Sequence, residues 1–413
     1  MSSPALARRL GLRDAVVIGL GSMLGAGVFA AFAPASAAAG SALLLALAAA
    51  AVVAYANATS SARLAALYPE SGGTYIYGRE RLGPFWGHLA GWGFVVGKTA
   101  SCAAMALTVG AYAVPQHPHL VAAAAVVAVT ALNVTGVQRS ATATRVVVAV
   151  VVAVLAAVVL VVAASGTWSA TALLSLEGVR AAGVLQGAAF LFFAFAGYAR
   201  IATLGEEVVD PSRTIPRAIP TALGITLLVY AAVAVALLLS LGPTGTAASA
   251  APLADAAAAV GADWLVPLVR VAAVVAALGS LLSLLLGVSR TTLAMARDGH
   301  LPATLSAVHP RFRVPHHAEV AVGAVVLVVV VVADVRSAIG FSSFAVLVYY
   351  AIANASALTL RGSRWSSAVA VVGILGCLAL AVALPTTSVV AGAVVLGIGA
   401  ATFLVRRRVS HRA

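Results

Sequence analysis

Residues 18–29 read Ile-Gly-Leu-Gly-Ser-Met-Leu-Gly-Ala-Gly-Val-Phe and lie inside the first long apolar run of the chain. Each of the four glycines in this stretch costs about 1 kcal/mol in a helix relative to alanine. Two interpretations fit the pattern. Gly21 and Gly25 have the small-x-x-x-small spacing that lets membrane helices pack closely. Alternatively, the segment is unwound at membrane depth, where free backbone groups must line a cavity and meet a ligand or an ion.

The whole chain has the composition of a polytopic membrane protein. Of its 413 residues, 62% are hydrophobic and only 9% are charged, and the mean hydropathy is +1.07. Soluble domains carry about 25% charged residues, and about 20 apolar residues of helix cross a bilayer. Apolar runs of that length recur and predict an all-α protein with about 12 transmembrane helices, at residues 14–40, 42–66, 84–113, 118–138, 144–164, 182–205, 216–241, 263–293, 318–334, 338–360, 365–385 and 388–405.

The placement of the charges predicts the orientation in the membrane. A net charge of +13 is compatible with nucleic-acid binding, but the basic residues stand singly or in pairs between the apolar runs. With the N-terminus inside, Lys98, Arg200 and Arg270 fall within spans, Arg180 and Arg336 fall outside, and all other basic residues lie at cytoplasmic segments. The positive-inside rule therefore favours cytoplasmic termini in the inner membrane and no nucleic-acid partner.

Motifs for catalysis, nucleotides and metals are missing from the sequence. A loop with the pattern G-x-x-x-x-G-K-[ST] is absent, and so is a G-x-S-x-G nucleophile elbow. The histidines at 300, 309, 316 and 317 have spacings that match no compact zinc site. We therefore expect neither an enzyme nor ATP-driven transport, and no metal, cofactor or catalytic residues.

A second unusual stretch lies in the sixth span, where residues 190–200 read Phe-Leu-Phe-Phe-Ala-Phe-Ala-Gly-Tyr-Ala-Arg. Aromatic residues in a helix are usually packing residues. However, interrupted spans at corresponding positions of two halves point to a transporter binding site. The N-terminus of a half-helix suits a carboxylate, and the free carbonyls at a C-terminus suit an ammonium group. A zwitterionic amino acid offers both charges.

Several segments, in order between residues 14 and 360, resemble motifs of the bacterial amino acid–polyamine–organocation (APC) superfamily. They are Gly-Ser-Met-Leu-Gly-Ala-Gly-Val-Phe at 21–29, Pro-Glu-Ser-Gly-Gly-Thr-Tyr at 69–75, Phe193 to Gly197 running into Ala-Thr-Leu-Gly-Glu-Glu at 202–207, Asp-Pro-Ser-Arg-Thr-Ile-Pro at 210–216, and Met-Ala-Arg-Asp-Gly-His-Leu-Pro at 295–302. The resemblance implies a LeuT-like fold with two inverted five-helix repeats. It places the transport core at 14–360, with repeats at 14–164 and 182–360, two peripheral helices at 365–405, and cytoplasmic tails at 1–13 and 406–413.

The resemblance also implies which residues bind the substrate. Backbone N–H groups of Gly25, Ala26 and Gly27 would bind a carboxylate. Backbone carbonyls would bind the amino group, and they are those of Met23, Phe193, Ala194 and Ala196. Phe193 or Phe195 would form an aromatic lid. The side-chain pocket would include Cys102 and Met105, which are small or apolar and therefore favour a neutral substrate.

Two charged residues within the spans carry further hypotheses. Lys98 lies in the middle of the third span, where a lysine costs about 2.5–3.5 kcal/mol on insertion scales. It either titrates, or supplies a fixed positive charge where other transporters bind a cation, or it snorkels or pairs with an acid. Arg200 either anchors the membrane edge or forms a cytoplasmic gate with Asp14, Glu206 or Glu207.

The sequence as a whole predicts a permease that carries amino acids across the bilayer by proton symport or by exchange with a counter-substrate, through alternating access. A polyamine or other cationic-amine carrier is the alternative, although such a site would need carboxylates that face the cavity. A membrane sensor that shares this fold without transporting anything is a further alternative. A membrane-embedded enzyme would need polar residues that converge at one depth, and Lys98 has no evident partner of that kind.

Overall fold

The computed structural model describes residues 10–68, 72–136, 141–166, 179–202 and 207–410. Apart from an isolated bridge between Leu10 and Val208, the regular structure in these ranges is helical. The helices are α1 (Leu12–Met23), α2 (Ala26–Ala30), α3 (Phe32–Ala39), η1 (Gly40–Ala42), α4 (Leu43–Leu67), α5 (Thr74–Leu82), α6 (Pro84–Ala113), α7 (Pro118–Val134), α8 (Ala141–Ala164), α10 (Ala181–Phe195), η2 (Ala196–Tyr198), α11 (Ala199–Ala202), α12 (Pro211–Ser240), α13 (Gly242–Ala248), α14 (Pro252–Ala259), α15 (Val266–Arg297), η3 (Ala303–Ser306), α16 (His316–Val332), α17 (Val335–Leu358), α18 (Arg364–Ala383) and α19 (Thr386–Ser410).

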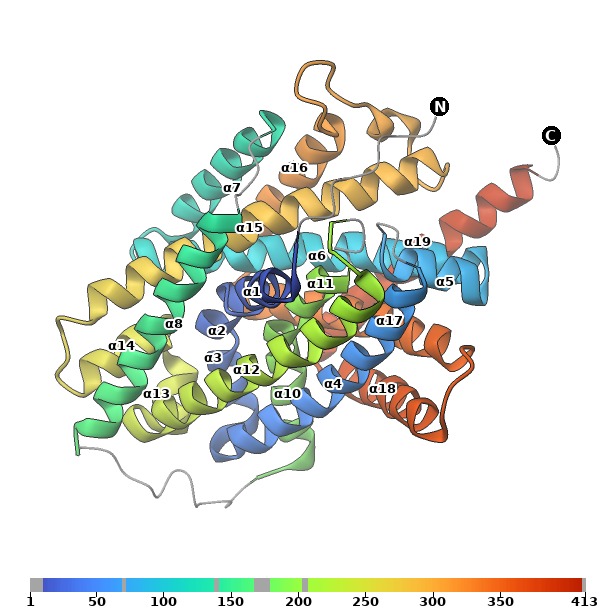
Figure 1. The fold of residues 1–413 in the computed structure, drawn as a ribbon. Helices are drawn as coiled ribbons and strands as arrows, with labels where there is room; N and C mark the ends of the chain where they lie inside the picture. The colour runs from blue at the N-terminus through green and yellow to red at the C-terminus, as the bar shows by residue number, and fades with distance from the viewer. Residues whose placement is uncertain (1–9, 69–71, 137–140, 167–178, 203–206, 411–413) are drawn as a thin grey trace.

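The predicted all-α polytopic membrane fold is confirmed. Ten helical segments among the described residues are long and apolar enough to cross a bilayer. Two shorter apolar helices, α7 and α16, have 17 residues each, which is the lower end of the length of about 17–25 residues that spans the hydrocarbon core. Each of these twelve segments corresponds to one predicted span, although the first two, Leu12–Ala30 and Phe32–Leu67, meet about ten residues before the boundary predicted between 14–40 and 42–66 (Figure 1).

Three short helices were not predicted. Helix α5 lies between the second and third spans, and α13 and α14 lie between the seventh and eighth spans. Helix α5 has mostly polar residues. Gly73 directly precedes it and Gly83 directly follows it, and their φ angles are 55° and 103°. Glycine adopts such angles without strain, so these two residues turn the chain sharply at both ends. A helix of nine residues carries too little periodic signal to be recognised beside long apolar runs.

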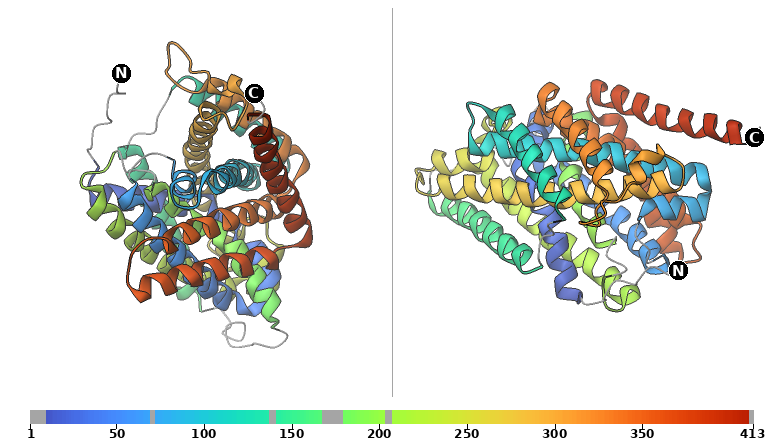
Figure 2. Two further views of the ribbon diagram at one scale, coloured as in Figure 1. Left: turned by 90° about the vertical axis from the view of Figure 1, so that its right-hand side faces the viewer. Right: turned by 90° about the horizontal axis from the view of Figure 1, so that it is seen from above.

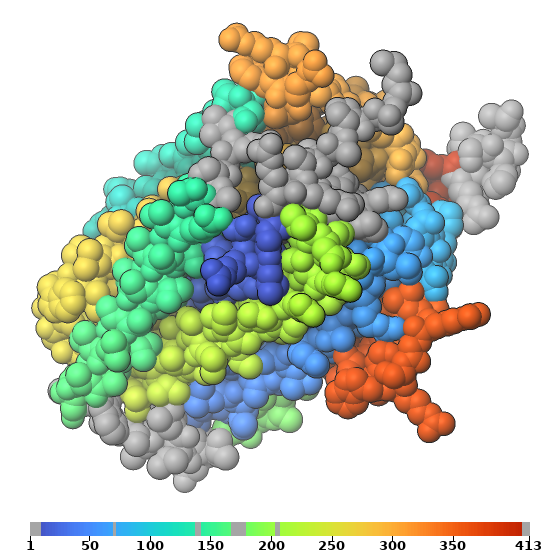
Figure 3. Space-filling view, viewed as in Figure 1, coloured from blue at the N-terminus to red at the C-terminus, as the bar shows by residue number. Residues whose placement is uncertain are grey.

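The spans form one interlocked bundle. Helix α6 packs against α15 and α17, and α4 packs against α10 and α12 (Figures 1 and 2). Helix α1 lies in a groove between α8 and α12, where it is visible from outside (Figure 3). Helices α18 and α19 pack on the outside of α17, and α18 also contacts α4, whereas α19 also contacts α6. The first and sixth spans thus each pack against several other spans, although α1 keeps one side open to the surface.

Small residues make this close packing possible. A Cβ atom placed on Gly97 of α6 would lie 2.9 Å from the Cβ atom of Ala345 on α17, and one placed on Gly91 would lie 2.7 Å from the Tyr75 ring. Within a bilayer apolar side chains gain little by leaving lipid, so spans associate through close van der Waals contact, which small residues permit.

Candidate functional site

The first span is interrupted at its centre. Helix α1 ends at Met23, α2 begins at Ala26, and Leu24 and Gly25 between them leave the helical path. The ψ angle of Gly25 is −134°, so the chain changes direction there. Residues 23–30 are all buried. The second half continues from α2 through Ala31 into α3, because the amide of Ala31 still donates to the carbonyl of Gly27 and that of Ala35 to Ala31.

The sixth span is interrupted in a milder way. Helix α10 ends at Phe195, and residues 196–198 form a 3₁₀ turn before α11 begins at Ala199. Phe195 and Ala196 keep helical φ and ψ angles, so the helix tightens without opening. Phe193 and Ala194, which we expected in an unwound segment, therefore belong to the last turn of α10. A 3₁₀ turn inside a helix is a feature often found at functional hinges.

Glycines bring the two interrupted spans into contact. A Cβ atom on Gly197 would lie 2.4 Å from the carbonyl oxygen of Ser22 in α1, and one on Gly27 would lie 2.7 Å from the Cα atom of Ala194. A Cβ atom on Gly25 would lie 1.9 Å from the Oγ atom of Ser280 in α15. The glycine-rich stretch is therefore both interrupted, at Leu24 and Gly25, and closely packed against its neighbours.

The carbonyls at the ends of α1 and α10 are joined through one tyrosine. The hydroxyl of Tyr230 in α12 lies 2.5 Å from the carbonyl oxygen of Met23 and 3.1 Å from that of Ala194. The hydroxyl of Tyr350 in α17 donates to the carbonyl of Ala196 over 3.4 Å. A tyrosine hydroxyl has a single proton, so Tyr230 can fully satisfy only one of its two carbonyls at a time. Three of the four backbone oxygens predicted to bind an amino group, those of Met23, Ala194 and Ala196, thus lie at the two phenols.

The other side of the break presents amide groups. The first N–H groups of a helix have no partner within it, and they carry positive dipole character. The half-helix that starts at Ala26 directs these groups toward Gly25, beside the hydroxyl of Ser280. This hydroxyl is buried and has no hydrogen-bond partner among the described residues. An amide end and an unpartnered hydroxyl at one buried point are suited to a carboxylate.

One face of α6 lies next to this amide end. Met105 packs in a small cluster that contains Ala26 and Ala277. Lys98 and Cys102 are seven and three residues before Met105, so the three side chains share a helix face. Lys98 is 7% exposed and makes no hydrogen bond or ion pair with any residue that the structure describes. Met105 thus lies beside the break, and Cys102 and Lys98 lie about one and two turns away from it along α6.

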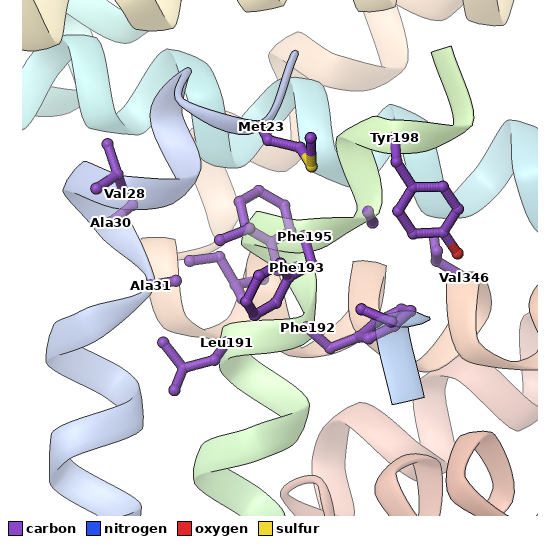
Figure 4. Packing of buried hydrophobic residues seen from close by; sticks show 14 of the residues in the cluster. Met23, Val28, Ala30, Ala31, Leu191, Phe192, Phe193, Phe195, Tyr198 and Val346 are labelled. Carbon is purple, nitrogen blue, oxygen red and sulfur yellow. The ribbon is translucent and has the colours of Figure 1, made fainter. Parts of the chain in front are cut away.

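The predicted lid and gate residues have distinct surroundings. Phe193 and Phe195 are both buried close to Met23 (Figure 4), and the Phe195 ring lies 5.0 Å from the Tyr230 ring. The expected pairing of Arg200 with Asp14 is wrong for this structure, because Asp14 forms an ion pair with Arg145 of α8. Glu207 and Arg290 lie near enough to act on the charge of Arg200. Glu206 falls outside the described residues.

Similarity to known proteins identifies the family of the chain. The model of a family described as amino acid permease matches residues 10–404 of the chain. The chain belongs to the amino acid permease family. It is 65% identical to an uncharacterized transporter of Mycobacterium tuberculosis, over 99% of this chain and 93% of that protein. It is 29% identical to human cationic amino acid transporter 4, over 88% of this chain and 61% of that protein, and 26% identical to the methylthioribose transporter of Bacillus subtilis, over 76% and 72%.

Two motifs of the permease meet at the end of the bundle, away from the break. The hydroxyl of Tyr75, from the Gly-Gly-Thr-Tyr segment, donates to Asp298 and lies 3.1 Å from Nδ1 of His300. Arg79 also donates to Asp298, over 3.2 Å. Burial and the neighbouring Asp298 raise the pKa of Tyr75, and burial lowers the pKa of His300. Tyr75 and Arg79 thus join α5 to the segment that follows α15.

Three polar residues of the permease site were missed by the sequence analysis. Tyr230, Ser280 and Tyr350 lie in the seventh, eighth and tenth spans, and all three are buried at the interrupted helices. Their sequence signal is weak, because single tyrosines and serines are common in spans. A polar residue inside a long apolar run, such as Tyr230 within Leu-Leu-Val-Tyr-Ala-Ala-Val at 227–233, is the pattern that would have found it.

Proposed function

We propose that this permease is a secondary transporter of neutral amino acids. The observation that supports it is the buried break in the first span, where amide groups of Gly25, Ala26 and Gly27 lie across from the carbonyls of Met23 and Ala194. One end of this arrangement suits a carboxylate and the other an ammonium group. An amino acid would replace the Tyr230 hydroxyl on one carbonyl, and Ala196 and Phe193 would complete the amino-group site.

The absence of a nearby carboxylate favours a neutral side chain. Among the described residues that contact the break, the polar side chains are Ser280 and Tyr230, and the nearest charged side chain on the pocket face of α6 is Lys98. A cationic side chain would be repelled by this lysine and would find no counter-charge. Cys102 and Met105 would bound the pocket, and Phe193 would close it.

A cationic amino acid is the second candidate, supported by the similarity to relatives such as human cationic amino acid transporter 4. Uptake of a panel of labelled amino acids into proteoliposomes, with and without a pH gradient, separates the candidates. We expect accumulation of neutral amino acids. Preferential uptake of arginine or lysine would favour the second candidate, and a chain that transports no amino acid or amine would overturn the proposal and leave a membrane sensor.

Two inverted repeats are supported by the helix contacts. We assign α1–α3, α4, α6, α7 and α8 to the first repeat and α10–α11, α12, α15, α16 and α17 to the second. When each helix is exchanged for its counterpart, contacts map onto contacts: α1 with α8 becomes α10 with α17, and α8 with α15 becomes α17 with α6. The pairs α4 with α12, α6 with α15 and α7 with α16 map onto themselves. Because five spans are an odd number, the second repeat begins on the opposite side of the membrane and is inverted.

Lys98 is our candidate for the coupling residue, by proton symport or by exchange. It is a buried and unpartnered base about one turn from the pocket, and charged groups at such depth are functional by default. The small pocket beside Gly21 and Leu24, between α1, α8 and α15, has apolar lining side chains apart from Thr144 and holds about 10 Å³, which is room for about one water. That lining gives little support to a sodium ion as the driving ion.

Replacing Lys98 with alanine tests the coupling role. We expect Lys98→Ala to retain exchange of substrate between the two sides, and to lose the increase in uptake that an inward proton gradient produces. Initial rates measured from pH 5 to 8 check this, with Val96→Ala as a control elsewhere on α6. An unchanged pH dependence would exclude Lys98 as the coupling residue and leave the substrate site untouched.

The basic residues support cytoplasmic termini in the cell membrane. Both termini lie at one end of the bundle, since Leu10 bonds to Glu207 and Arg406 bonds to Gly299. The same end carries Arg63, Arg81, Arg297 and Arg361. Arg200, with Glu207 and Arg290 nearby, would form a gate at this cytoplasmic end.

A further inference from the structure

An open groove lies at the end of the bundle that carries the termini. It has a volume of about 580 Å³ and is lined by Arg63, Ala66, Leu67, Arg81, Pro216, Thr359, Leu360 and Arg361. Its walls come from the end of α4, from α5, from the first turns of α12 and from the link between α17 and α18. Neither the interrupted spans nor the residues around them contribute to it.

Three arginines line the groove, and the lining residues that the structure describes include no carboxylate. Arg81 is held in place, because it donates to the hydroxyl of Thr359 over 2.7 Å and to its carbonyl oxygen. Arg63 and Arg361 make no hydrogen bond or ion pair with any residue in the described ranges. Like charges gathered in a concave site repel one another, so an anion that reaches all three would relieve the repulsion.

The remaining lining residues are mainly apolar. Leu67, Leu360, Pro216 and Ala66 form this part of the groove, and Leu67 is 53% exposed. Helices α4 and α17 are membrane spans that end at Leu67 and Leu358, so the groove lies at the boundary between the bilayer and water. A site with cationic groups beside apolar surface at this depth matches an amphiphile with an anionic head.

The geometry points to a binding site for a phosphate anion, supplied by the headgroup of an anionic phospholipid. Guanidinium groups bind phosphate oxygens through paired hydrogen bonds, and basic pockets between spans on the cytoplasmic side suit such headgroups. The apolar lining favours the lipid over free phosphate, because it would receive the first carbons of the acyl chains. The groove is bounded by α4 and α17, which also contact the sixth span, so a bound lipid would join helices of both proposed repeats.

Native mass spectrometry of the purified full chain tests this site. The detergent-solubilised protein is titrated with dioleoyl phosphatidylglycerol or with dioleoyl phosphatidylcholine, and calorimetry with inorganic phosphate tests the free anion. We expect phosphatidylglycerol to bind more tightly than phosphatidylcholine. The pair Arg63→Gln and Arg361→Gln should weaken that binding by about tenfold or more, since each basic residue near an anionic surface contributes roughly a factor of five.

The matched control removes the same charge from the same end of the molecule. Arg297→Gln with Arg311→Gln replaces two exposed arginines outside the groove, and we expect it to leave phosphatidylglycerol binding within about twofold. Arg63→Lys with Arg361→Lys should keep most of the binding and shows that the groove variants fold. Binding of inorganic phosphate that depends on Arg63 and Arg361, without lipid binding, would assign the site to a soluble phosphate. Equal phosphatidylglycerol binding in groove and control variants, or equal binding of both lipids, would overturn the proposal.

Discussion

The two interrupted spans differ in how far they depart from a helix. In the first span, Leu24 and Gly25 leave the helical path and expose the amide end of the following half-helix. In the sixth span Phe195, Ala196 and Ala199 keep helical angles, and the interruption is a 3₁₀ turn at residues 196–198. The first span therefore provides the open backbone, and the sixth provides a rigid surface against which that backbone rests.

The sequence difference behind this contrast is local. The first span has Gly25 and Gly27 two residues apart at its break, whereas the sixth has the single Gly197 after a run of aromatic residues. Phe192 and Phe195 pack against Tyr350 and Tyr230 with ring centroids 5.7 and 5.0 Å apart. Such buried aromatic contacts hold α10 in its helical form, since aromatic pairs add about 0.5–1.5 kcal/mol beyond their buried area.

Substitution of Gly197 should have the largest effect on the contact between the two interrupted spans. A Cβ atom on Gly197 would meet the backbone of α1, with Ser22 O at 2.4 Å and Met23 N at 2.8 Å. Backbone atoms cannot rotate away, so Gly197→Ala must separate α1 from η2. We expect a loss of about 3 kcal/mol or more of folding free energy and no transport, measured by thermal melting in detergent and by uptake.

Gly224→Ala is the control for that substitution. Gly224 also lies within a span, α12, but a Cβ atom there would have no other atom within 4 Å. Alanine is better than glycine in a helix by about 1 kcal/mol, so this variant should match or exceed the wild-type melting temperature. If Gly197→Ala behaved like Gly224→Ala, the sixth span would not be a rigid support for the break.

Tyr230 is the link between the two spans, and its removal should have the next largest effect. Tyr230→Phe keeps the ring and deletes the hydroxyl that lies 2.5 Å from Met23 O and 3.1 Å from Ala194 O. Leaving buried carbonyls without a donor costs about 1–3 kcal/mol. We expect a measurable fall in the melting temperature of the substrate-free protein, and a recovery of part of it when an amino acid that binds to these carbonyls is added.

Tyr350→Phe provides the comparison within the same site. Its hydroxyl lies 3.4 Å from Ala196 O, which is at the outer limit of a hydrogen bond, so the fall should be smaller than for Tyr230→Phe. An unchanged melting temperature in both variants would mean that the phenols act only through packing, because both variants keep the ring and lose only the hydroxyl.

The sequence predicted the twelve spans and the position of the break in the first of them, because both depend on local patterns of apolar residues and glycines. It did not predict that the carbonyls of Met23 and Ala194 share one hydroxyl, because Tyr230 is 207 residues from Met23 and nothing in either segment reports that contact. The partner of Asp14 was assigned wrongly for the same reason. From the sequence alone, Arg145 of the fifth span and Arg200 of the sixth are equally suitable ion-pair partners for Asp14. The packing of α1 against α8 brings Arg145 to Asp14.

The contact between Gly25 and Ser280 tests the role of the break in the first span. A Cβ atom on Gly25 would lie 1.9 Å from Ser280 Oγ and 2.9 Å from Ser280 Cβ. The hydroxyl of Ser280 can rotate away from an added methyl group, but its Cβ atom cannot. We therefore expect Gly25→Ala to lower the uptake rate by about tenfold. This factor corresponds to the lower part of the roughly 1–3 kcal/mol that overpacking typically costs. Adding Ser280→Ala removes only the oxygen and should restore little. Adding Ser280→Gly removes both atoms and should restore much of the uptake, provided that the defect is steric. The single variant Ser280→Gly must remain active for this test. If Ser280→Gly then failed to rescue Gly25→Ala, Gly25 would be needed for its backbone amide geometry. The contact of the break with α15 would in that case contribute nothing to transport.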